Sequence, residues 1–217
     1  MIKIEVLKME IKIEHYTKII AKRKVLNDIN INLCGGKIYG LVGTNGSGKT
    51  MLMRAICGLI LPTKGKVVFN DKVIGKDVFF PESTGVLIEN PSFIPNYSGF
   101  MNLKYIANLN KVIDDRDIVD ILTDVGLDAL DKLPYRKYSL GMKQKLGIAA
   151  AIMEKPKLII LDEPFNAIDE ESVNRIIKII MELKSDDRII IISCHDSTKI
   201  EMLCDENINI SNGIITM

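Results

Sequence analysis

The stretch GTNGSGKT, residues 43–50, packs three glycines, a lysine and a threonine into eight residues directly after the apolar run IYGLV. Backbone N–H groups can surround phosphate oxygens only where side chains are small, and a lysine ammonium reaches the outer phosphates. The spacing G-x-x-x-x-G-K-[ST] therefore predicts a polyphosphate-binding loop, with an ordinary glycine-rich turn as the alternative. The residues predicted to hold the ligand are Gly43, Asn45, Gly46, Ser47, Gly48, Lys49 and Thr50.

The segments around this loop are expected to form an α/β domain. The run KIYGLV (37–42) predicts a buried strand, and TMLMRAICGLI (50–60) predicts the helix that follows the loop. Alternating apolar residues at 2–13, together with the run at 25–31, predict antiparallel strands. Strands rich in Ile, Leu and Val that are joined by helices imply a parallel sheet covered on both faces. The further elements predicted are strands at 66–70, 84–89, 157–161 and 188–193, and a helix at 170–185.

The segment 90–153 changes to helical periodicity and is expected to be a helical insertion in the α/β core. We therefore divide the single domain, 1–217, into a polyphosphate-binding core with a β subdomain (1–89 and 154–217) and a helical subdomain (90–153).

Composition limits the partners that the chain is expected to have. Lys and Arg number 29 against 28 Asp and Glu, so the formal net charge of +1 provides no basic field for nucleic acid. No apolar run approaches the ~20 residues of a membrane-spanning helix, and the N-terminus lacks the apolar region of a secretory signal. The chain is therefore expected in the cytoplasm. Its four cysteines form no C-x-x-C pair, which favours reduced thiols.

The run LIILDEP places Asp162 and Glu163 at the carboxyl end of a buried strand, where open α/β sheets bind their ligands. Adjacent strand residues point to opposite sides, so two successive carboxylates are expected to have different tasks. We assign Asp162, with Thr50, to a magnesium ion, and Glu163 to orienting or deprotonating an attacking water, a contribution of roughly 10²- to 10⁴-fold in rate. An acidic turn before Pro164 is the alternative.

Two further segments carry candidate site residues. His195 follows the strand at 188–193, so a parallel sheet would bring its imidazole to the same edge as Asp162; a structural histidine is the alternative. In YSLGMKQK (138–145), Ser139 can cap the following helix and Gly141 lets a ligand approach the helix N-terminus. An ordinary helix cap would explain the same residues.

The order of these segments, GTNGSGKT, then YSLGMKQK, then LIILDEP with a histidine after the next strand, resembles the ATP-binding subunit of ABC transporters over almost the whole chain. The resemblance implies a P-loop NTPase (RecA-like) core with an antiparallel N-terminal β subdomain and an inserted α-helical subdomain. It also implies binding of ATP and Mg²⁺, and ATP hydrolysis coupled to transport.

In that family two ATP-binding domains form a head-to-tail dimer, which for this chain would be a homodimer. The resemblance implies that Ser139 and Gly141 of one subunit touch the γ-phosphate held by the other subunit. Residues 166–169, ending at Asp169, match the loop that links the two sites. His195 matches the family's switch histidine, so the expected catalytic residues are Glu163, His195 and Lys49.

Three departures from the family pattern concern the site. Ile20 stands where an aromatic residue normally stacks on adenine, unless Tyr16 substitutes for it. Leu140 and Met142 stand where many members have glycine and glutamine. Glu89 occupies the place of the family's glutamine, where a carboxylate can still bind magnesium but adds negative charge beside the phosphates.

Glu89, together with SLGMKQ, looks like transporters for bacitracin resistance or lantibiotic self-protection. This resemblance implies export of an antimicrobial peptide through a separately encoded permease, with the chain held at the cytoplasmic face of the membrane. The permease is expected to dock around 90–105, where three aromatic residues are equally plausible in the core. They are Phe93, Tyr97 and Phe100.

Other functions stay open at this stage. A drug, ion or lipid exporter would use a very similar subunit, and a regulatory module that hydrolyses ATP poorly is suggested by Ile20 and Glu89. An ABC ATPase of DNA repair or ribosome work would need a coiled-coil insertion or a basic arm that the sequence lacks. A small-molecule kinase or a GTPase is disfavoured by the signature segment (YSLGMKQK, 138–145), which resembles the signature motif of the ABC family.

Overall fold

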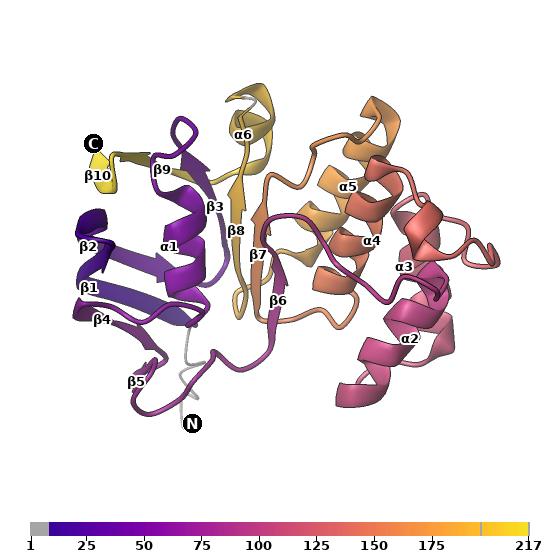
Figure 1. Ribbon diagram of the computed structural model, residues 1–217, viewed down its shortest axis with the longest axis horizontal. Coiled ribbons are helices and arrows are strands. Elements are labelled where there is room, and N and C mark those ends of the chain that lie inside the picture. Colours follow the sequence, from indigo (N-terminus) through magenta and orange to yellow (C-terminus); the bar gives the residue numbers. More distant parts are fainter. Residues whose placement is uncertain (1–8, 196, 217) are drawn as a thin grey trace, which may run out of the picture.

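The computed structural model describes residues 9–195 and 197–216 and contains two β-sheets (Figure 1). A four-stranded antiparallel sheet has the order β2-β1-β4-β5, and a six-stranded central sheet has the order β10-β9-β3-β8-β7-β6. The antiparallel sheet is built from β1 (Glu10–Ile20), β2 (Arg23–Cys34), β4 (Lys64–Phe69) and β5 (Lys72–Val73).

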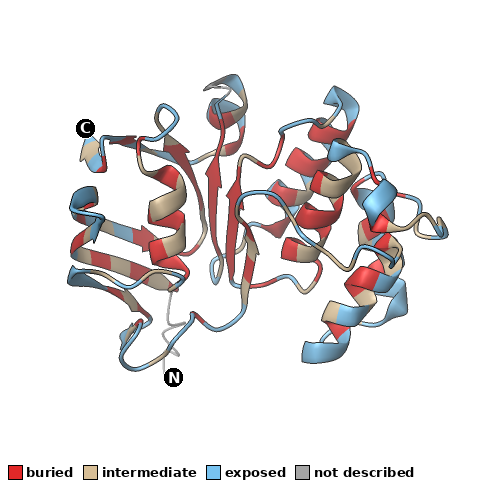
Figure 2. Cartoon of the chain, viewed as in Figure 1, coloured by how far each residue is buried: buried red, intermediate tan, exposed pale blue. Residues whose placement is uncertain are grey.

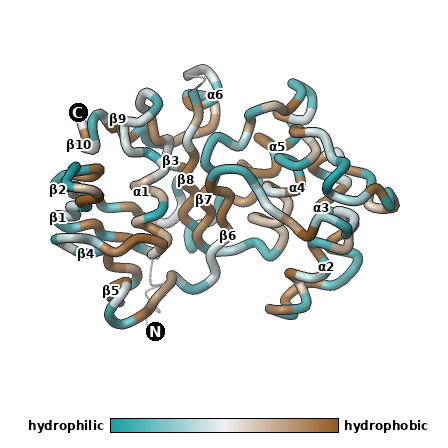
Figure 3. Tube along the Cα trace, viewed as in Figure 1, coloured by the Kyte–Doolittle hydropathy of each residue, from teal (hydrophilic) through white to brown (hydrophobic). Residues whose placement is uncertain are grey.

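The central sheet is parallel from β9 to β6, and only β10 runs antiparallel to its neighbour. Parallel strands end at one edge, so the loops after β3, β7 and β8 lie together. Every residue of β7 and β8 is buried, and the two strands are among the most hydrophobic parts of the chain (Figure 3). The strands are β3 (Lys37–Val42), β6 (Thr84–Leu87), β7 (Leu158–Asp162), β8 (Ile189–Ser193), β9 (Glu206–Ser211) and β10 (Ile214–Thr216).

Helices cover both faces of the central sheet (Figure 1). Helix α1 (Lys49–Ile56) lies between the two sheets and joins them in one apolar cluster, while α4 (Leu140–Ile152) and α5 (Glu170–Leu183) pack on the other face. The buried residues lie on the strands of the central sheet and on the sides of the helices that pack on it (Figure 2). The remaining helices are α2 (Gly99–Asn110), α3 (Asp115–Asp124), the 3-10 helix η1 (Tyr135–Lys137) and α6 (Ser197–Leu203).

The predicted fold class is confirmed, because an antiparallel sheet precedes a parallel sheet that carries helices on both faces. Helices α2 to α4 lie in the chain between β6 and β7, which are neighbours in the sheet. The predicted strand at 2–13 falls partly on residues 1–8, which lie outside the described residues. The helix expected at 50–60 ends earlier, at Ile56, because Gly58 takes a positive φ of 78°.

The aromatic residues near 90–105 divide between core and surface. Phe93 packs edge-on against Tyr135 with ring centroids 5.3 Å apart, and Phe100 packs on the core cluster. Tyr97 keeps 39% of its surface exposed. Of these three residues, only Tyr97 therefore offers a large exposed apolar surface.

In the parts of the chain that the structure describes, no helix combines the length and the hydrophobicity that crossing a bilayer requires. Burial raises the pKa of the Cys57 and Cys204 thiols to about 12. These two thiols therefore stay protonated at neutral pH, which agrees with the expected reduced state.

Candidate active site

The glycine-rich loop follows β3 and ends where Lys49 begins α1. The Lys49 ammonium donates to the backbone oxygens of Gly43 (2.6 Å) and Thr44 (3.2 Å). Gly48 has a φ of 116°, which L side chains rarely adopt. A Cβ on Gly43 would lie 2.3 Å from the backbone oxygen of Ile210, so this position tolerates only glycine. The sequence thus folds into a loop whose backbone is exposed beside one fixed positive charge.

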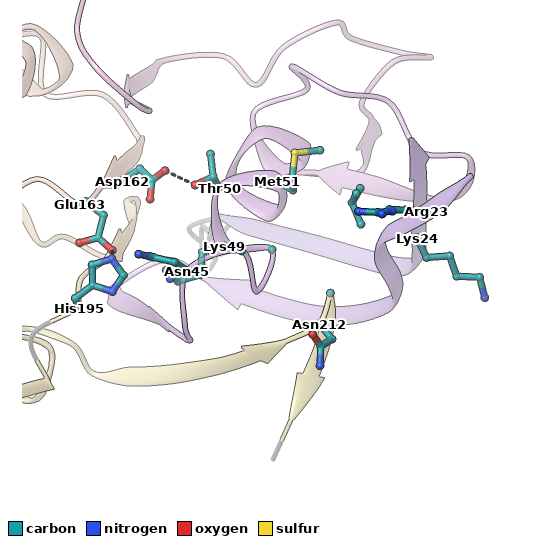
Figure 4. A pocket seen from close by; sticks show the side chains of 14 residues that line it. Arg23, Lys24, Asn45, Lys49, Thr50, Met51, Asp162, Glu163, His195 and Asn212 are labelled. Atoms are coloured by element: carbon teal, nitrogen blue, oxygen red, sulfur yellow. Dashed lines mark hydrogen bonds and ion pairs between the residues drawn. The ribbon is translucent and has the colours of Figure 1, made fainter. Parts of the chain in front are cut away.

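A cavity of about 510 Å³ opens at this loop (Figure 4). Its inner end is formed by the loop together with Asp162, Glu163 and His195, and its outer end by residues of β2 and the β9–β10 turn. This volume falls in the range of small-ligand sites, roughly 300–1,000 Å³. The lining residues include Arg23, Lys24, Val25, Asn45, Gly46, Gly48, Lys49, Thr50, Asn212 and Gly213.

Asp162 is held by two hydroxyl groups. Thr50 donates to its Oδ2 at 2.6 Å, and Ser193 donates to its Oδ1 at 2.5 Å. Among the described residues no three His, Cys, Asp or Glu side chains group as metal ligands. Mg²⁺ commonly takes one or two protein oxygens and completes its shell with water and substrate phosphates, so Thr50 and Asp162 form a donor set that fits this ion.

Glu163 follows β7 with a backbone φ of 48°, in the left-handed region. His195 Nε2 lies 3.0 Å from Glu163 Oε1, as expected for residues that follow neighbouring parallel strands. Burial raises the pKa of Glu163 above 4.5, and the His195 and Lys49 charges oppose this shift. A raised pKa makes the ionised carboxylate a stronger base, which suits proton abstraction from water.

Two residues that the sequence analysis missed support these acids. The Ser193 hydroxyl, completely buried, also accepts a hydrogen bond from the Glu163 N–H at 2.9 Å. Gln144 Nε2 donates to the backbone oxygens of Glu163 (3.1 Å) and Pro164 (3.3 Å). The available signals were a hydroxyl at the end of the run IIIIS and an amide in the largely apolar helix α4.

Among the predicted site residues, Gly43 and Ser47 of the loop do not line this cavity, and neither do Ser139, Gly141 and Asp169. Ser139 caps α4 by accepting from the Met142 N–H at 3.2 Å, and Gly141 approaches the backbone oxygen of Ala167 so closely that an added Cβ would lie 2.6 Å away. Asp169 caps α5 and pairs with Lys145, and both the Ser172 N–H and the Lys145 charge lower the pKa of its carboxyl. The cavity of one chain is therefore formed without the signature segment.

The predicted contact of Ile20 with adenine stays a prediction. Ile20 is 44% exposed at the end of β1 and is not a lining residue. Tyr16 cannot replace the missing aromatic residue: its side chain is completely buried and its hydroxyl donates to the Ile60 backbone oxygen, so that alternative is wrong.

Glu89 lines a second cavity of about 300 Å³, which shares Asp162 and Glu163 with the first. Its Oε1 pairs with the Arg54 guanidinium of α1 at 2.5 Å. This pairing offsets the negative charge of the Glu89 carboxylate. A metal-binding role of Glu89 stays a prediction.

Comparisons with known proteins agree with the resemblance to ATP-binding subunits of ABC transporters. A family model described as "ABC transporter" matches residues 26–166. The chain is 44% identical over 203 residues to the uncharacterized ABC transporter ATP-binding protein YybJ of Bacillus subtilis (94% of this chain, 93% of YybJ). It is 37% identical to the lantibiotic transport ATP-binding protein SrtF of Streptococcus pyogenes (90% of this chain, 84% of SrtF).

Two further comparisons extend this result. The bacitracin transport ATP-binding protein BcrA of Enterococcus faecalis is 38% identical over 90% of the chain, which spans 64% of BcrA. A solved structure titled "Structure of ATP binding subunit of ABC transporter" superposes with a TM-score of 0.86 at 24% identity (95% of this chain, 88% of that chain), which supports the fold.

Proposed function

Because the chain belongs to the ABC transporter family, as an ATP-binding subunit with ATPase activity, we propose that it powers export of an antimicrobial peptide through a separately encoded permease. The observation that carries the ATPase role is the meeting of Lys49, Asp162, Glu163 and His195 at one cavity. The peptide class is supported by the similarity to SrtF and BcrA, whose names state lantibiotic and bacitracin transport.

The geometry supports a direct attack of water on the γ-phosphorus of ATP. Lys49 and the loop N–H groups bind the phosphates, and Glu163 accepts a proton from the attacking water. The bond from the γ-phosphorus to the β–γ bridging oxygen breaks, so ADP leaves with that oxygen. Thr50 and Asp162 would hold Mg²⁺, which neutralises phosphate charge when bound. His195, whose Nε2 lies 3.0 Å from Glu163 Oε1, would orient the carboxylate and contact the γ-phosphate of bound ATP.

The position of the signature segment supports a head-to-tail homodimer. Ser139 and Gly141 are not cavity residues of their own chain, and Ser139 begins a helix whose N-terminus can bind an anion. A second chain could place this helix end over the triphosphate. Such a dimer, bound to its permease, would work at the cytoplasmic face of the membrane.

The ATPase role is tested by the turnover of the purified chain and of Glu163→Gln. The substitution removes the base but keeps the side-chain size, so turnover should fall by at least ~10²-fold. Glu171→Gln, on the exposed face of α5, is the matched control and should keep wild-type turnover. A wild-type chain without turnover, or a fully active Glu163→Gln, would contradict the proposal.

The cargo is tested in cells that lack the transporter. The permease that co-purifies with the chain is expressed with the wild type or with Glu163→Gln, and survival is measured against bacitracin and a lantibiotic. We expect the wild type, but not Glu163→Gln, to raise the tolerated concentration of at least one peptide. Equal sensitivity of all strains to both peptides would overturn the cargo assignment and favour another exported substrate.

A further inference from the structure

The backbone of Glu163 is held from two sides by side chains. Its N–H donates to Ser193 at the end of β8, and its carbonyl oxygen accepts from Gln144 of α4. The first contact ties Glu163 to the central sheet. The second ties it to the helix that begins at Ser139. The carboxylate is attached between these two groups, so a shift of α4 relative to the sheet would reorient it.

Gln144 is well placed for this contact. Its side chain is 7% exposed, and both hydrogen bonds of its amide nitrogen go to the turn after β7, at Glu163 and Pro164. A neutral amide satisfies two carbonyl oxygens there without adding charge beside the carboxylate. Replacing it by an apolar side chain would leave these oxygens without that donor.

The same helix face braces the rest of the turn. Gly141 lies three residues before Gln144 and four residues before Lys145, so it is a neighbour of both side chains on the surface of α4. Gly141 closely approaches the Ala167 backbone oxygen, and Lys145 pairs with Asp169 at 3.0 Å. Helix α4 therefore contacts residues 163–169 at their start, middle and end.

This turn needs such support. Glu163 and Ala167 have φ values of 48° and 60°, and side chains other than glycine adopt this region only at a cost in free energy. The second cavity, about 300 Å³, is lined by Gln144, Glu163 and Ala167, so the contact between α4 and the turn forms part of its wall. Gln144 thus joins α4 by hydrogen bonds to a turn with a strained backbone.

We propose that Gln144 is a positioning residue that couples the signature helix α4 to the catalytic base of the same chain. Binding of Ser139 to a nucleotide on a second chain would shift helix α4. Gln144 would transmit this shift of α4 to Glu163. The inference rests on the proposed ATPase function. It adds a connection within one chain between Glu163, the base of that chain's own ATP site, and Ser139, which would contact the ATP bound to the second chain.

The test compares Gln144→Leu and Gln144→Glu with Asn102→Leu. Asn102 is a matched control, since it is a buried amide of α2 that binds backbone groups away from Glu163. We expect both Gln144 variants to lose about ten-fold or more in kcat, because small misplacement of a reacting group is costly, with KM for ATP changed less than ~3-fold. Asn102→Leu should lose stability without this selective loss of kcat.

A double-mutant cycle separates positioning from a structural role. In the Glu163→Gln background the base is absent, so adding Gln144→Leu should leave the residual turnover and ATP-driven dimerisation unchanged. An equal fall of kcat in both backgrounds, or wild-type kcat in both Gln144 variants, would overturn the inference. A wild-type chain without turnover would instead contradict the proposed function, so the two failures are distinguishable.

Discussion

At the scale of single residues, the fixed orientation of Asp162 depends on Ser193. The two carboxylate oxygens of Asp162 receive hydroxyl groups from different elements, Thr50 of α1 and Ser193 of β8. Groups that hydrogen-bond to a metal ligand set its direction and its basicity. Ser193 thereby connects Asp162, the proposed metal ligand, with the backbone of Glu163, the proposed base.

We therefore expect Ser193→Ala to lower the affinity of the site for Mg²⁺. Loss of a supporting partner of this kind typically costs about 10–100-fold in metal affinity or activity, so the Mg²⁺ concentration for half-maximal turnover should rise. Titration of turnover with Mg²⁺ measures this effect. Thr17→Val, which removes a buried hydroxyl of β1, serves as control. Unchanged Mg²⁺ dependence in Ser193→Ala would contradict the role given to Ser193.

The pKa of Glu163 gives a pH prediction. Only the ionised carboxylate accepts a proton, so kcat/KM should fall as pH drops through a pKa that burial has raised above 4.5. Removing His195 removes a charge that lowers this pKa, so in His195→Ala the acid limb should move to higher pH. Profiles of kcat/KM against pH measure the shift, with the exposed His15→Ala as control. If the acid limb of the His195→Ala profile stayed at the wild-type pH, the electrostatic effect of His195 on Glu163 would be excluded.

At the scale of elements, sequence patterns located the strands that are buried on both faces. The runs at 157–161 and 188–193 each hold four consecutive apolar residues and become β7 and β8 with shifts of one residue at most. Strands β9 and β10 and helix α6 were not predicted. Strand β9 is mostly exposed, and its short period-two alternation, with Ile208 and Ile210 between polar residues, was overlooked; it pairs with β3.

Close packing of β6 on α4 gives a stability prediction. A Cβ on Gly85 would lie 1.7 Å from the backbone oxygen of Ala151 and 2.7 Å from Pro156. Gly85→Ala should therefore push α4 from the sheet and lower the free energy of unfolding by about 1–3 kcal/mol. Denaturant unfolding of the two chains measures the difference. An unfolding midpoint equal to that of the wild type would contradict close packing of Gly85 on α4.

At the scale of the whole molecule, the sequence predicted which motifs share an edge but not how they are connected. Asp162, Glu163 and His195 follow neighbouring strands, so their meeting was predictable from a parallel sheet. The contacts of Gln144 with Glu163 and of Arg54 with Glu89 were not. They join segments that are distant in the chain, and no local periodicity encodes the packing of α4 on the turn after β7.

A head-to-tail dimer predicts complementation between two inactive variants. Lys49→Ala removes the phosphate contact and Ser139→Arg blocks the signature helix, so each homodimer has two defective sites. A mixed dimer has one site with both defects and one site with neither. If the sites are independent, an equal mixture should recover up to about a quarter of wild-type turnover. No recovery in a mixture shown to form mixed dimers would contradict the composite site.

The left-handed backbone at Glu163 has a consequence for the heat resistance of the protein. Glycine adopts this conformation without the strain that glutamate carries there, of order 1–3 kcal/mol. Glu163→Gly should therefore melt at a higher temperature than the natural chain while being unable to complete a turnover, which calorimetry can verify. A glycine at this position would favour thermal stability, whereas the glutamate favours catalysis. Position 163 is therefore one where the protein carries a cost in stability for its activity.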